Sequence, residues 1–156
     1  MSICVTGTPG VGKTFLAKKL AKKLRLKYID VNKVVKDYKL SIGYDKKRKS
    51  MIVDAEKLSK LLVKIIKKNK KVIIDGHLSH YLPRTYVDLC IVVKCDLKTL
   101  KTRLKKRGYS KEKIRENLDA EIFEICLQEA KENSHDIIVI DGGKSFNLNK
   151  IIKKIK

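Results

Sequence analysis

Short apolar runs alternate with amphipathic stretches along the whole chain. Four of the runs are four or five residues long, which is typical of buried strands in a parallel sheet, and they cover residues 3–6, 72–75, 89–93 and 137–141. Residues 27–31 are interpreted as a further short strand. Apolar side chains at helical spacing follow each run. This order predicts an α/β fold, in which a doubly wound, five-stranded parallel sheet is flanked by helices on both faces.

The helical stretches begin at recognisable residues. Asp54 and Asp96 precede two of them, where an aspartate can accept a hydrogen bond from a free backbone N–H. The expected apolar faces behind these caps are Leu58, Leu61, Leu62, Ile65 and Ile66, and then Leu97, Leu100 and Leu104. A further helix is expected to carry Ile114, Leu118, Ile122 and Ile125 on one face, and a short helix is expected from Asn147 onward.

The segment between the second strand and Asp54 fits this alternation poorly. Residues 32–53 contain a short helical piece around Val34, followed by an irregular, basic stretch through Gly43-Tyr44-Asp45. A long polar insertion in a compact domain is more often functional than a simple connection. We interpret it as a functional loop or lid.

The segment from Gly7 to Thr14 reads GTPGVGKT and matches the phosphate-binding loop pattern G-x-x-x-x-G-K-[ST] at every fixed position. Its glycines let backbone N–H groups surround an anion, and the helix that begins near Gly12 adds the positive end of its dipole. Lys13 is expected to reach the β- and γ-phosphates, and Thr14 to bind Mg²⁺ through its hydroxyl. The context of strand, loop and helix predicts a P-loop NTPase.

Two aspartates are candidates for the second protein contribution to the Mg²⁺ site. Asp75 and Asp141 each end an apolar run, and the carboxyl ends of parallel strands line the ligand crevice of an open sheet. His77 follows the first aspartate with a further polar group, whereas Asp141 runs into the turn residues Gly142-Gly143. We therefore favour Asp75, with a helix-cap or turn role as its alternative.

Two arginines border the apolar face of the helix that follows Asp96. Arg103 and Arg107 lie one turn apart, so both guanidinium groups can point into a crevice. There they would neutralise charge on a transferring phosphoryl group. Decoration of the solvent-exposed surface is the alternative interpretation.

The net charge of +21 has two interpretations. Clustered lysines release counterions from nucleic-acid phosphates and bind RNA without sequence preference. Lysine, glutamate and isoleucine in excess are also typical of the solvated surface of a hyperthermophile protein. The lysines are spread over almost every element, and the sequence leaves both interpretations open.

Size and cysteine usage limit the class of protein. The 156 residues suit a single domain spanning residues 1–156. No apolar run approaches the roughly 20 residues that span a bilayer, and the N-terminus enters a strand without a leader pattern, so we expect a cytoplasmic protein without membrane contact. The four cysteines contain no C-x-x-C pair and are interpreted as reduced core residues.

In combination, these motifs resemble those of the adenylate kinase isoenzyme 6 (CINAP-like) family of P-loop nucleoside monophosphate kinases, in an archaeal-type member. The resemblance covers nearly the whole chain. It rests on residues 6–14, on Gly43-Tyr44-Asp45, on Asp75-x-His77, on Arg107-Gly108-Tyr109 and on Glu121-Ile122-Phe123.

The resemblance implies a domain with a monophosphate-binding region at about residues 32–54 and a lid at about residues 106–116. It implies transfer of the ATP γ-phosphate to AMP with Mg²⁺ as cofactor, and ATP hydrolysis beside it. It further implies a role in small ribosomal subunit maturation, with a platform ribosomal protein of the protein eleven type and pre-ribosomal RNA as partners.

The resemblance also implies roles for individual residues. The implied ATP-binding residues are Gly10, Val11, Gly12, Lys13, Thr14, Phe15, Arg107 and Lys144, and the implied metal site is Thr14 with Asp75. The implied catalytic residues are Lys13, Arg103, Arg107 and His77. The implied monophosphate-binding residues are Lys36, Tyr44 and Asp45. Lys36 stands where relatives have an arginine, so a point charge replaces a bidentate fork.

Three functions from different classes remain at this stage. The first is phosphotransfer to AMP or a related monophosphate. The second is an ATPase that acts mainly in ribosome assembly, in which His77 would orient the attacking water; bracing of the loop that ends at Pro83 is the alternative for His77. A GTPase is disfavoured because Asn32-Lys33-Val34-Val35 lacks the aspartate of the guanine-reading Asn-Lys-x-Asp motif.

Overall fold

The computed structural model describes residues 1–156 and is built around a five-stranded sheet. The strands are β1 (Ser2–Thr6), β2 (Lys27–Asp30), β5 (Val72–Asp75), β6 (Leu89–Lys94) and β7 (Ile137–Asp141). They lie in the order β2-β5-β1-β6-β7, and every neighbouring pair is parallel. The predicted α/β fold and all five predicted strands are confirmed.

The register of the sheet determines which strand ends meet. Val5, near the end of β1, lies level with Asp75 of β5 on one side and Ile91 of β6 on the other. The phosphate-binding loop leaves β1 one residue later. The end of β5 is therefore placed directly beside the start of that loop.

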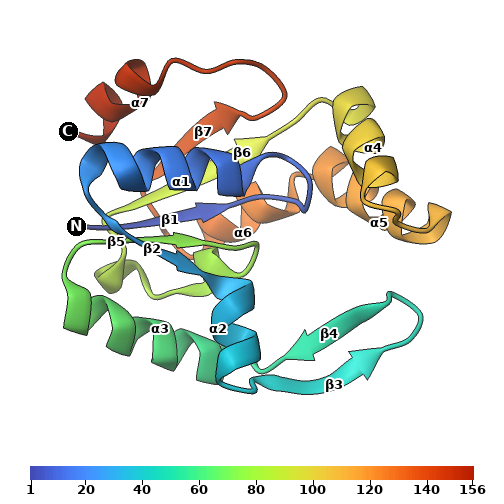
Figure 1. Ribbon diagram of the computed structural model, residues 1–156, viewed down its shortest axis with the longest axis horizontal. Helices are drawn as coiled ribbons and strands as arrows, with labels where there is room; N and C mark the ends of the chain where they lie inside the picture. Colours follow the sequence, from blue (N-terminus) through green and yellow to red (C-terminus); the bar gives the residue numbers. More distant parts are fainter.

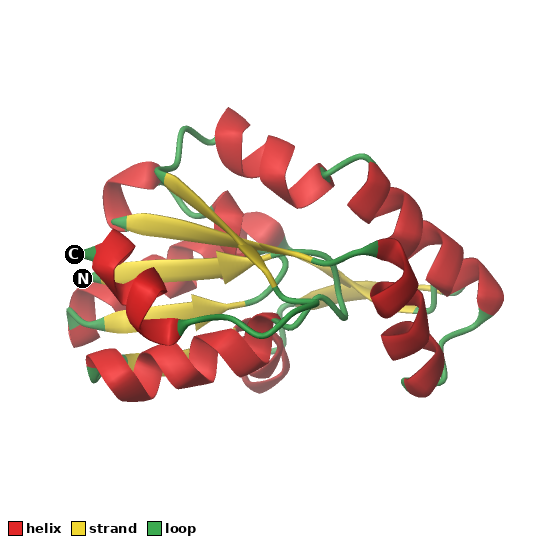
Figure 2. Cartoon of the chain, turned by 90° about the horizontal axis from the view of Figure 1, so that it is seen from above, coloured by secondary structure: helices red, strands yellow, loops and turns green.

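Helices cover both faces of the sheet, because alternate strand residues point to opposite sides. Ile3 and Val5 pack with α1 (Lys13–Leu24), α4 (Leu97–Lys106) and α7 (Leu148–Ile155), and Cys4 packs with α3 (Ala55–Asn69) and α6 (Ile125–Glu132). Figure 2 shows the helices on either side of the strands. The two core clusters thus follow from the period of two in the strands.

The predicted helix caps are confirmed. The Asp54 carboxylate accepts a hydrogen bond from the Lys57 N–H at 3.1 Å, and the Asp96 carboxylate accepts one from the Thr99 N–H at 2.9 Å. The C-terminal helix begins in the same way after Asn147. All four cysteines are free thiols, and three of them are buried.

The prediction of a single helix that carries both Ile114 and Ile125 is wrong. The chain forms α5 (Lys111–Ile122), turns at Glu124 in a left-handed conformation (φ 52°), and continues as α6 in a new direction. Ile122 and Ile125 are therefore 53% and 41% exposed. The turn lets α6 bury Leu127 and Ala130 against the sheet while α5 remains beside α4.

The stretch expected to be irregular between residues 39 and 53 is a β-hairpin. After the short helix α2 (Val31–Asp37), β3 (Ser41–Asp45) pairs antiparallel with β4 (Ser50–Val53) around a turn of four basic residues. Large side chains on both strands are exposed, including Ile42, Tyr44 and Met51. A strand pair without a buried face lacks the apolar alternation on which sequence prediction depends.

The hairpin and the α4–α5 pair both project beyond the carboxyl ends of the central strands, at the right of Figure 1. Their tips touch: the Lys113 ammonium donates a hydrogen bond to the Lys49 carbonyl at 3.1 Å, and Arg48 lies 3.9 Å from the Glu116 carboxylate. Two short 3₁₀ helices, η1 (Ser79–Tyr81) and η2 (Arg84–Tyr86), connect β5 to β6. None of the helices combines the length and apolar character needed to cross a membrane.

Candidate active site

The phosphate-binding loop has the backbone conformation that its glycines allow. Gly10 and Gly12 have φ angles of 95° and 104°, in a region that other residues rarely adopt. Gly7 packs so closely on β6 that a Cβ atom would lie 2.4 Å from the Val93 carbonyl oxygen. The loop is consequently fixed between its own strand and the neighbouring strand.

Thr14 and Asp75 meet at one side of this loop. Asp75 is only 3% exposed, and its Oδ2 accepts hydrogen bonds from the Thr14 hydroxyl at 2.6 Å and the Tyr28 hydroxyl at 2.7 Å. Its Oδ1 is buried without a partner. A hydroxyl, a carboxylate and a free carboxylate oxygen are oxygen donors of the kind that Mg²⁺ prefers, so the residues present fit the ion.

Tyr28 is a site residue that the sequence analysis missed. It lies at the second position of β2, and its hydroxyl reaches Asp75 across 47 residues of chain. Burial raises the pKa of Tyr28, and the Asp75 carboxylate raises it further. The hydroxyl therefore remains a donor that orients the carboxylate, and only the sheet order could have revealed this.

Asp141, the rival metal candidate, takes part in a turn. Its Oδ1 accepts a hydrogen bond from the Gly143 N–H at 2.8 Å. This is the turn role that the Gly142-Gly143 sequence indicated.

Lys13 extends over the loop, and its ammonium donates a hydrogen bond to the Thr8 carbonyl at 3.2 Å. Partial burial lowers the pKa of Lys13 to about 8, while the Asp75 carboxylate acts in the opposite direction. Arg107, Glu121 and Cys126 also lie close enough to influence this charge. Lys13 is thus the centre of a charged cluster contributed by four different elements.

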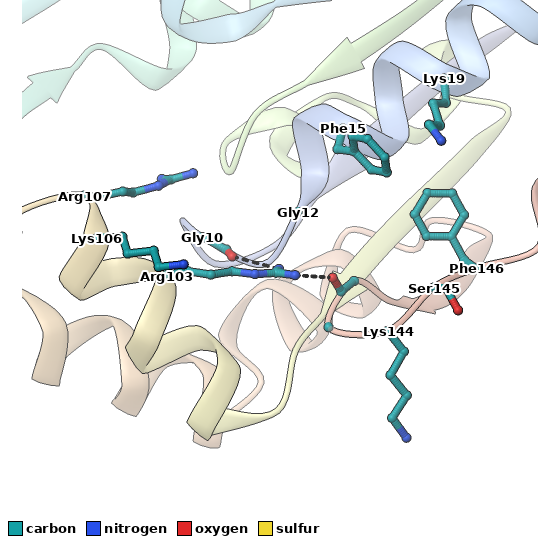
Figure 3. A pocket seen from close by; sticks show the side chains of 12 residues that line it. Gly10, Gly12, Phe15, Lys19, Arg103, Lys106, Arg107, Lys144, Ser145 and Phe146 are labelled. Carbon is teal, nitrogen blue, oxygen red and sulfur yellow. Dashed lines mark hydrogen bonds between the residues drawn. The ribbon is translucent and has the colours of Figure 1, made fainter.

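A cavity of about 700 Å³ opens in front of the loop. Its wall consists of Gly10, Gly12, Phe15, Lys19, Arg103, Lys106, Arg107 and residues 142–146. Phe15 and Phe146 face one another edge to face, with ring centres 5.9 Å apart, at the side remote from Arg107 (Figure 3). Phe15 and Lys144, both implied by the family resemblance, line this cavity, although the Lys144 side chain points away from the loop (Figure 3).

Both predicted arginines line this cavity, but only one of the two guanidinium groups is hydrogen-bonded to the protein. The Arg103 guanidinium donates hydrogen bonds to the Gly10 carbonyl at 3.3 Å and the Gly142 carbonyl at 2.9 Å, and thereby ties two loops together. The Arg107 guanidinium makes no hydrogen bond or ion pair, and in Figure 3 the side chain extends from the end of α4 toward the loop. Arg107 is therefore available to a phosphate group.

His77 lies two residues after Asp75 and does not line the cavity, and its ring forms no hydrogen bond with the protein. The protein atoms around it and the charge of Lys13 lower the pKa of His77 to about 4. The alternative role predicted for His77, bracing its loop, belongs instead to His80. The imidazole of His80 lies 2.7 Å from the Thr6 hydroxyl and 2.6 Å from the Glu129 carboxylate.

Glu121 is a second residue for which the sequence carried no chemical indication beyond its place in the Glu121-Ile122-Phe123 motif. It is 8% exposed, and its Oε2 is buried without a partner. Burial raises the pKa of Glu121, and the charge of Lys94 opposes that rise. Its influence on Lys13 places this carboxyl group in the same charged cluster.

The residues expected to bind the monophosphate lie on the projecting elements. Lys36 is exposed on α2, Tyr44 is exposed on β3, and the Asp45 carboxylate accepts a hydrogen bond from the Arg48 N–H at 3.0 Å. None of the three lines the cavity in front of the loop. Their role in binding a monophosphate remains a prediction.

Comparison with known proteins extends over most of the chain. The family model described as "AAA domain" matches residues 3–124. A "Putative adenylate kinase" of Methanocaldococcus jannaschii is 42% identical over 156 residues, which are 100% of this chain and 86% of that protein. The "Adenylate kinase isoenzyme 6 homolog FAP7" of Saccharomyces cerevisiae is 40% identical over 141 residues, which are 90% of this chain and 71% of the yeast protein.

Solved structures support the fold alone. One described as a "putative kinase" from Chloroflexus aurantiacus superimposes with a TM-score of 0.61 at 16% identity, covering 99% of this chain and 95% of the other. The parallel sheet with its flanking helices is thus an arrangement that this chain shares with that structure.

Proposed function

The chain belongs to the adenylate kinase isoenzyme 6 family of P-loop nucleotide kinases, and we propose that it transfers the γ-phosphate of ATP to AMP, giving two molecules of ADP. The observation that carries this proposal is the convergence of Thr14 and Asp75 at 2.6 Å beside a cavity into which Arg107 extends without a partner. These groups suit the three demands of phosphoryl transfer, which are metal binding, phosphate binding and neutralisation of developing charge.

ATP is proposed to bind with its phosphates in the glycine-rich loop and its base near Phe15 and Phe146. Thr14 and Asp75 would hold Mg²⁺, and the ion would reduce the charge of the ATP phosphates. Lys13 holds the β- and γ-oxygens, and Arg107 contacts the transferring group. Arg103 maintains the distance between the phosphate-binding loop and the Gly142 segment, which fixes the width of the cavity.

The acceptor is proposed to enter between the cavity and the hairpin. An oxygen of the AMP phosphate attacks the γ-phosphorus, the bond from that phosphorus to the β,γ-bridging oxygen breaks, and ADP leaves with the electron pair. The acceptor oxygen is already ionised near neutral pH, so the step needs alignment rather than a base. Lys36 and Tyr44, on α2 and β3, would hold the acceptor.

A panel of nucleoside monophosphates with ATP and Mg²⁺ tests this function. We expect ADP formation to be fastest with AMP, and to be lost on removal of Mg²⁺ with a chelator. Equal ADP formation with and without every monophosphate would contradict the kinase proposal and leave only hydrolysis.

We also propose ATP hydrolysis as a second activity, because the His77 ring has no partner in the protein and is free to orient a water molecule. His77→Ala should lower AMP-independent hydrolysis more than AMP phosphorylation, and His77→Gln should retain more hydrolysis than alanine. Equal losses in both rates would remove the water-orienting role.

A role in small ribosomal subunit maturation is part of the same proposal. The net charge of +21 would favour ribosomal RNA, and a platform ribosomal protein is the expected protein partner. Binding to pre-ribosomal RNA should weaken steeply as salt is raised. Binding that does not depend on salt would argue against contact through the basic surface.

A further inference from the structure

A chain of hydrogen bonds runs through the protein behind the phosphate-binding loop. Its centre is His80 of η1, which is 1% exposed. The Nδ1 atom of His80 lies 2.7 Å from the Thr6 hydroxyl, and its Nε2 atom lies 2.6 Å from Oε2 of Glu129. The same carboxylate oxygen accepts a hydrogen bond from the Tyr81 hydroxyl at 2.7 Å.

The chemistry of the groups fixes the direction of this chain. An ionised carboxylate only accepts hydrogen bonds, so Nε2 of His80 must carry the proton that points at Glu129. In the neutral ring Nδ1 is then an acceptor, and the Thr6 hydroxyl donates to it. Two further groups lie within reach of that hydroxyl: the His77 carbonyl, which is farther away at 3.4 Å, and the thiol of Cys126.

The three residues belong to three different parts of the protein, which are the end of β1, the segment after Asp75 and α6. Thr6 is the last residue of β1 and immediately precedes Gly7 of the loop. His80 lies in the segment that follows Asp75, which is fastened to the same strand by the Gly76 N–H and the Ser79 hydroxyl, both donating to the Val5 carbonyl at 3.1 Å. Glu129 lies on α6, three residues after Cys126, which is close enough to Lys13 for the charge of Lys13 to lower the pKa of its thiol, against the larger effect of burial.

A second contact holds the backbone of this histidine in place. The Nε2 atom of His135, in the segment before β7, lies 2.8 Å from the His80 carbonyl. Both the ring and the backbone of His80 are therefore constrained. Such a degree of fixation exceeds what a surface connection between two strands requires, because surface loops need few buried polar contacts.

We infer that the Thr6–His80–Glu129 chain is a positioning device, which holds the start of the phosphate-binding loop and the segment after Asp75 in register with α6. The three residues do not touch the substrate. They act through Lys13 and Asp75, whose separation decides whether phosphate and metal are aligned. The inference rests on the phosphotransfer proposed above, and it adds residues that the family motifs leave without a role.

Thr6→Val tests the inference, because valine keeps the shape of the side chain and removes the hydroxyl. We expect kcat to fall on the order of 10-fold while the KM for ATP changes by less than about 3-fold, since misalignment affects the transition state more than ground-state binding. Thr6→Ser should restore most of kcat. Glu129→Gln, at the more exposed end of the chain, should give a smaller loss in the same direction.

Ser2→Ala is the matched control. Ser2 lies at the other end of β1, is buried, and donates a hydrogen bond through its hydroxyl to the Tyr86 carbonyl, far from the loop. It should lower Tm and leave kcat unchanged. A Thr6→Val protein with lowered Tm and unaltered kcat would overturn the inference, because the chain would then serve stability alone.

The tautomer of His80 gives a readout that does not depend on activity. Nitrogen NMR of the imidazole should find the proton on Nε2 in the wild-type protein, and a proton on Nδ1 would overturn the inference. If the wild-type protein forms no ADP from any monophosphate, the proposed kinase fails, and kcat for ATP hydrolysis then replaces kcat for transfer in the same comparison. If the wild-type protein transfers phosphate and Thr6→Val does so equally well, only the positioning role fails.

Discussion

The half of this molecule proposed to bind ATP and the half proposed to bind the acceptor are constructed in opposite ways. The phosphate-binding loop lies between buried strands, and Thr14 and Asp75, the residues proposed to hold the metal, are already hydrogen-bonded to each other at 2.6 Å. The hairpin β3–β4 exposes Ile42, Tyr44 and Met51, and its tip meets α5 through Arg48 and Lys113. One half is fixed by the core, and the other is held by a few surface contacts.

This difference indicates how the protein binds each of the two proposed substrates. A rigid loop can be complementary to phosphate before ATP arrives, which avoids reorganisation during the reaction. An exposed hairpin can move when an acceptor binds, and closure on both substrates excludes water from the transferring group. We therefore expect substitutions in the ATP-binding half to reduce kcat, and those in the acceptor half to change KM for the monophosphate.

The largest effect is expected from Lys13→Met. Loss of this preorganised charge should lower kcat on the order of 10²-fold or more, measured as ADP formation at saturating substrates. Lys19→Met is a matched control, since Lys19 lines the same cavity but packs over the Phe15 ring. Near-normal turnover of the Lys13 variant would contradict the placement of ATP in this loop.

Arg107→Ala should have the next largest effect and separates the two arginines. Because Arg107 has no partner in the protein, its removal should lower kcat by about 10-fold or more, with a smaller change in the Kd for ATP. Arg103→Ala should also lower Tm, because it releases the Gly10 and Gly142 carbonyls. If Arg107→Ala changes only the Kd for ATP, the guanidinium binds ATP in the ground state. If the substitution changes neither kcat nor the Kd, Arg107 belongs to the solvated surface.

Lys36→Arg examines the acceptor half and should have a smaller effect. A guanidinium offers a bidentate contact to phosphate that an ammonium lacks, so KM for AMP should fall by a few-fold while KM for ATP stays the same. Lys33→Arg, one turn earlier and paired with Asp37, is the control. An unchanged KM for AMP would place the acceptor phosphate away from α2.

The smallest expected effect is on the pH dependence of stability, and it concerns His80, behind the phosphate-binding loop. Burial lowers the pKa of His80, and Glu129 of α6 opposes this, while His135 and Tyr81 are the other titratable groups against it. Below the ordinary histidine pKa of about 6.5 the unfolded chain binds a proton that folded His80 does not, so stability is lost as pH falls toward the folded pKa. Tm should therefore decrease between pH 7.5 and pH 5.5, and it should decrease less in His80→Asn. Equal slopes for both proteins would contradict the lowered pKa.

The fold and the ATP side of the site could be predicted from the sequence because they depend on local patterns. The eight residues from Gly7 to Thr14 are contiguous, and four of the five strands contain three or more consecutive apolar residues. Asp54 and Asp96 act on N–H groups three residues away. Prediction failed at two places. The hairpin has no buried face and therefore no apolar alternation, and the chain turns at Glu124 although the apolar residues on either side keep the spacing of a single helix.

What the sequence by itself determined is the phosphate-binding loop, the strands of the central sheet and the helix caps at Asp54 and Asp96, since these need only neighbours along the chain. The tertiary structure decided which distant groups complete them. Tyr28 reaches Asp75 across 47 residues, and His80 reaches Thr6 across 74. Such contacts follow from strand order and register, and these are set by packing of the whole core rather than by any local sequence.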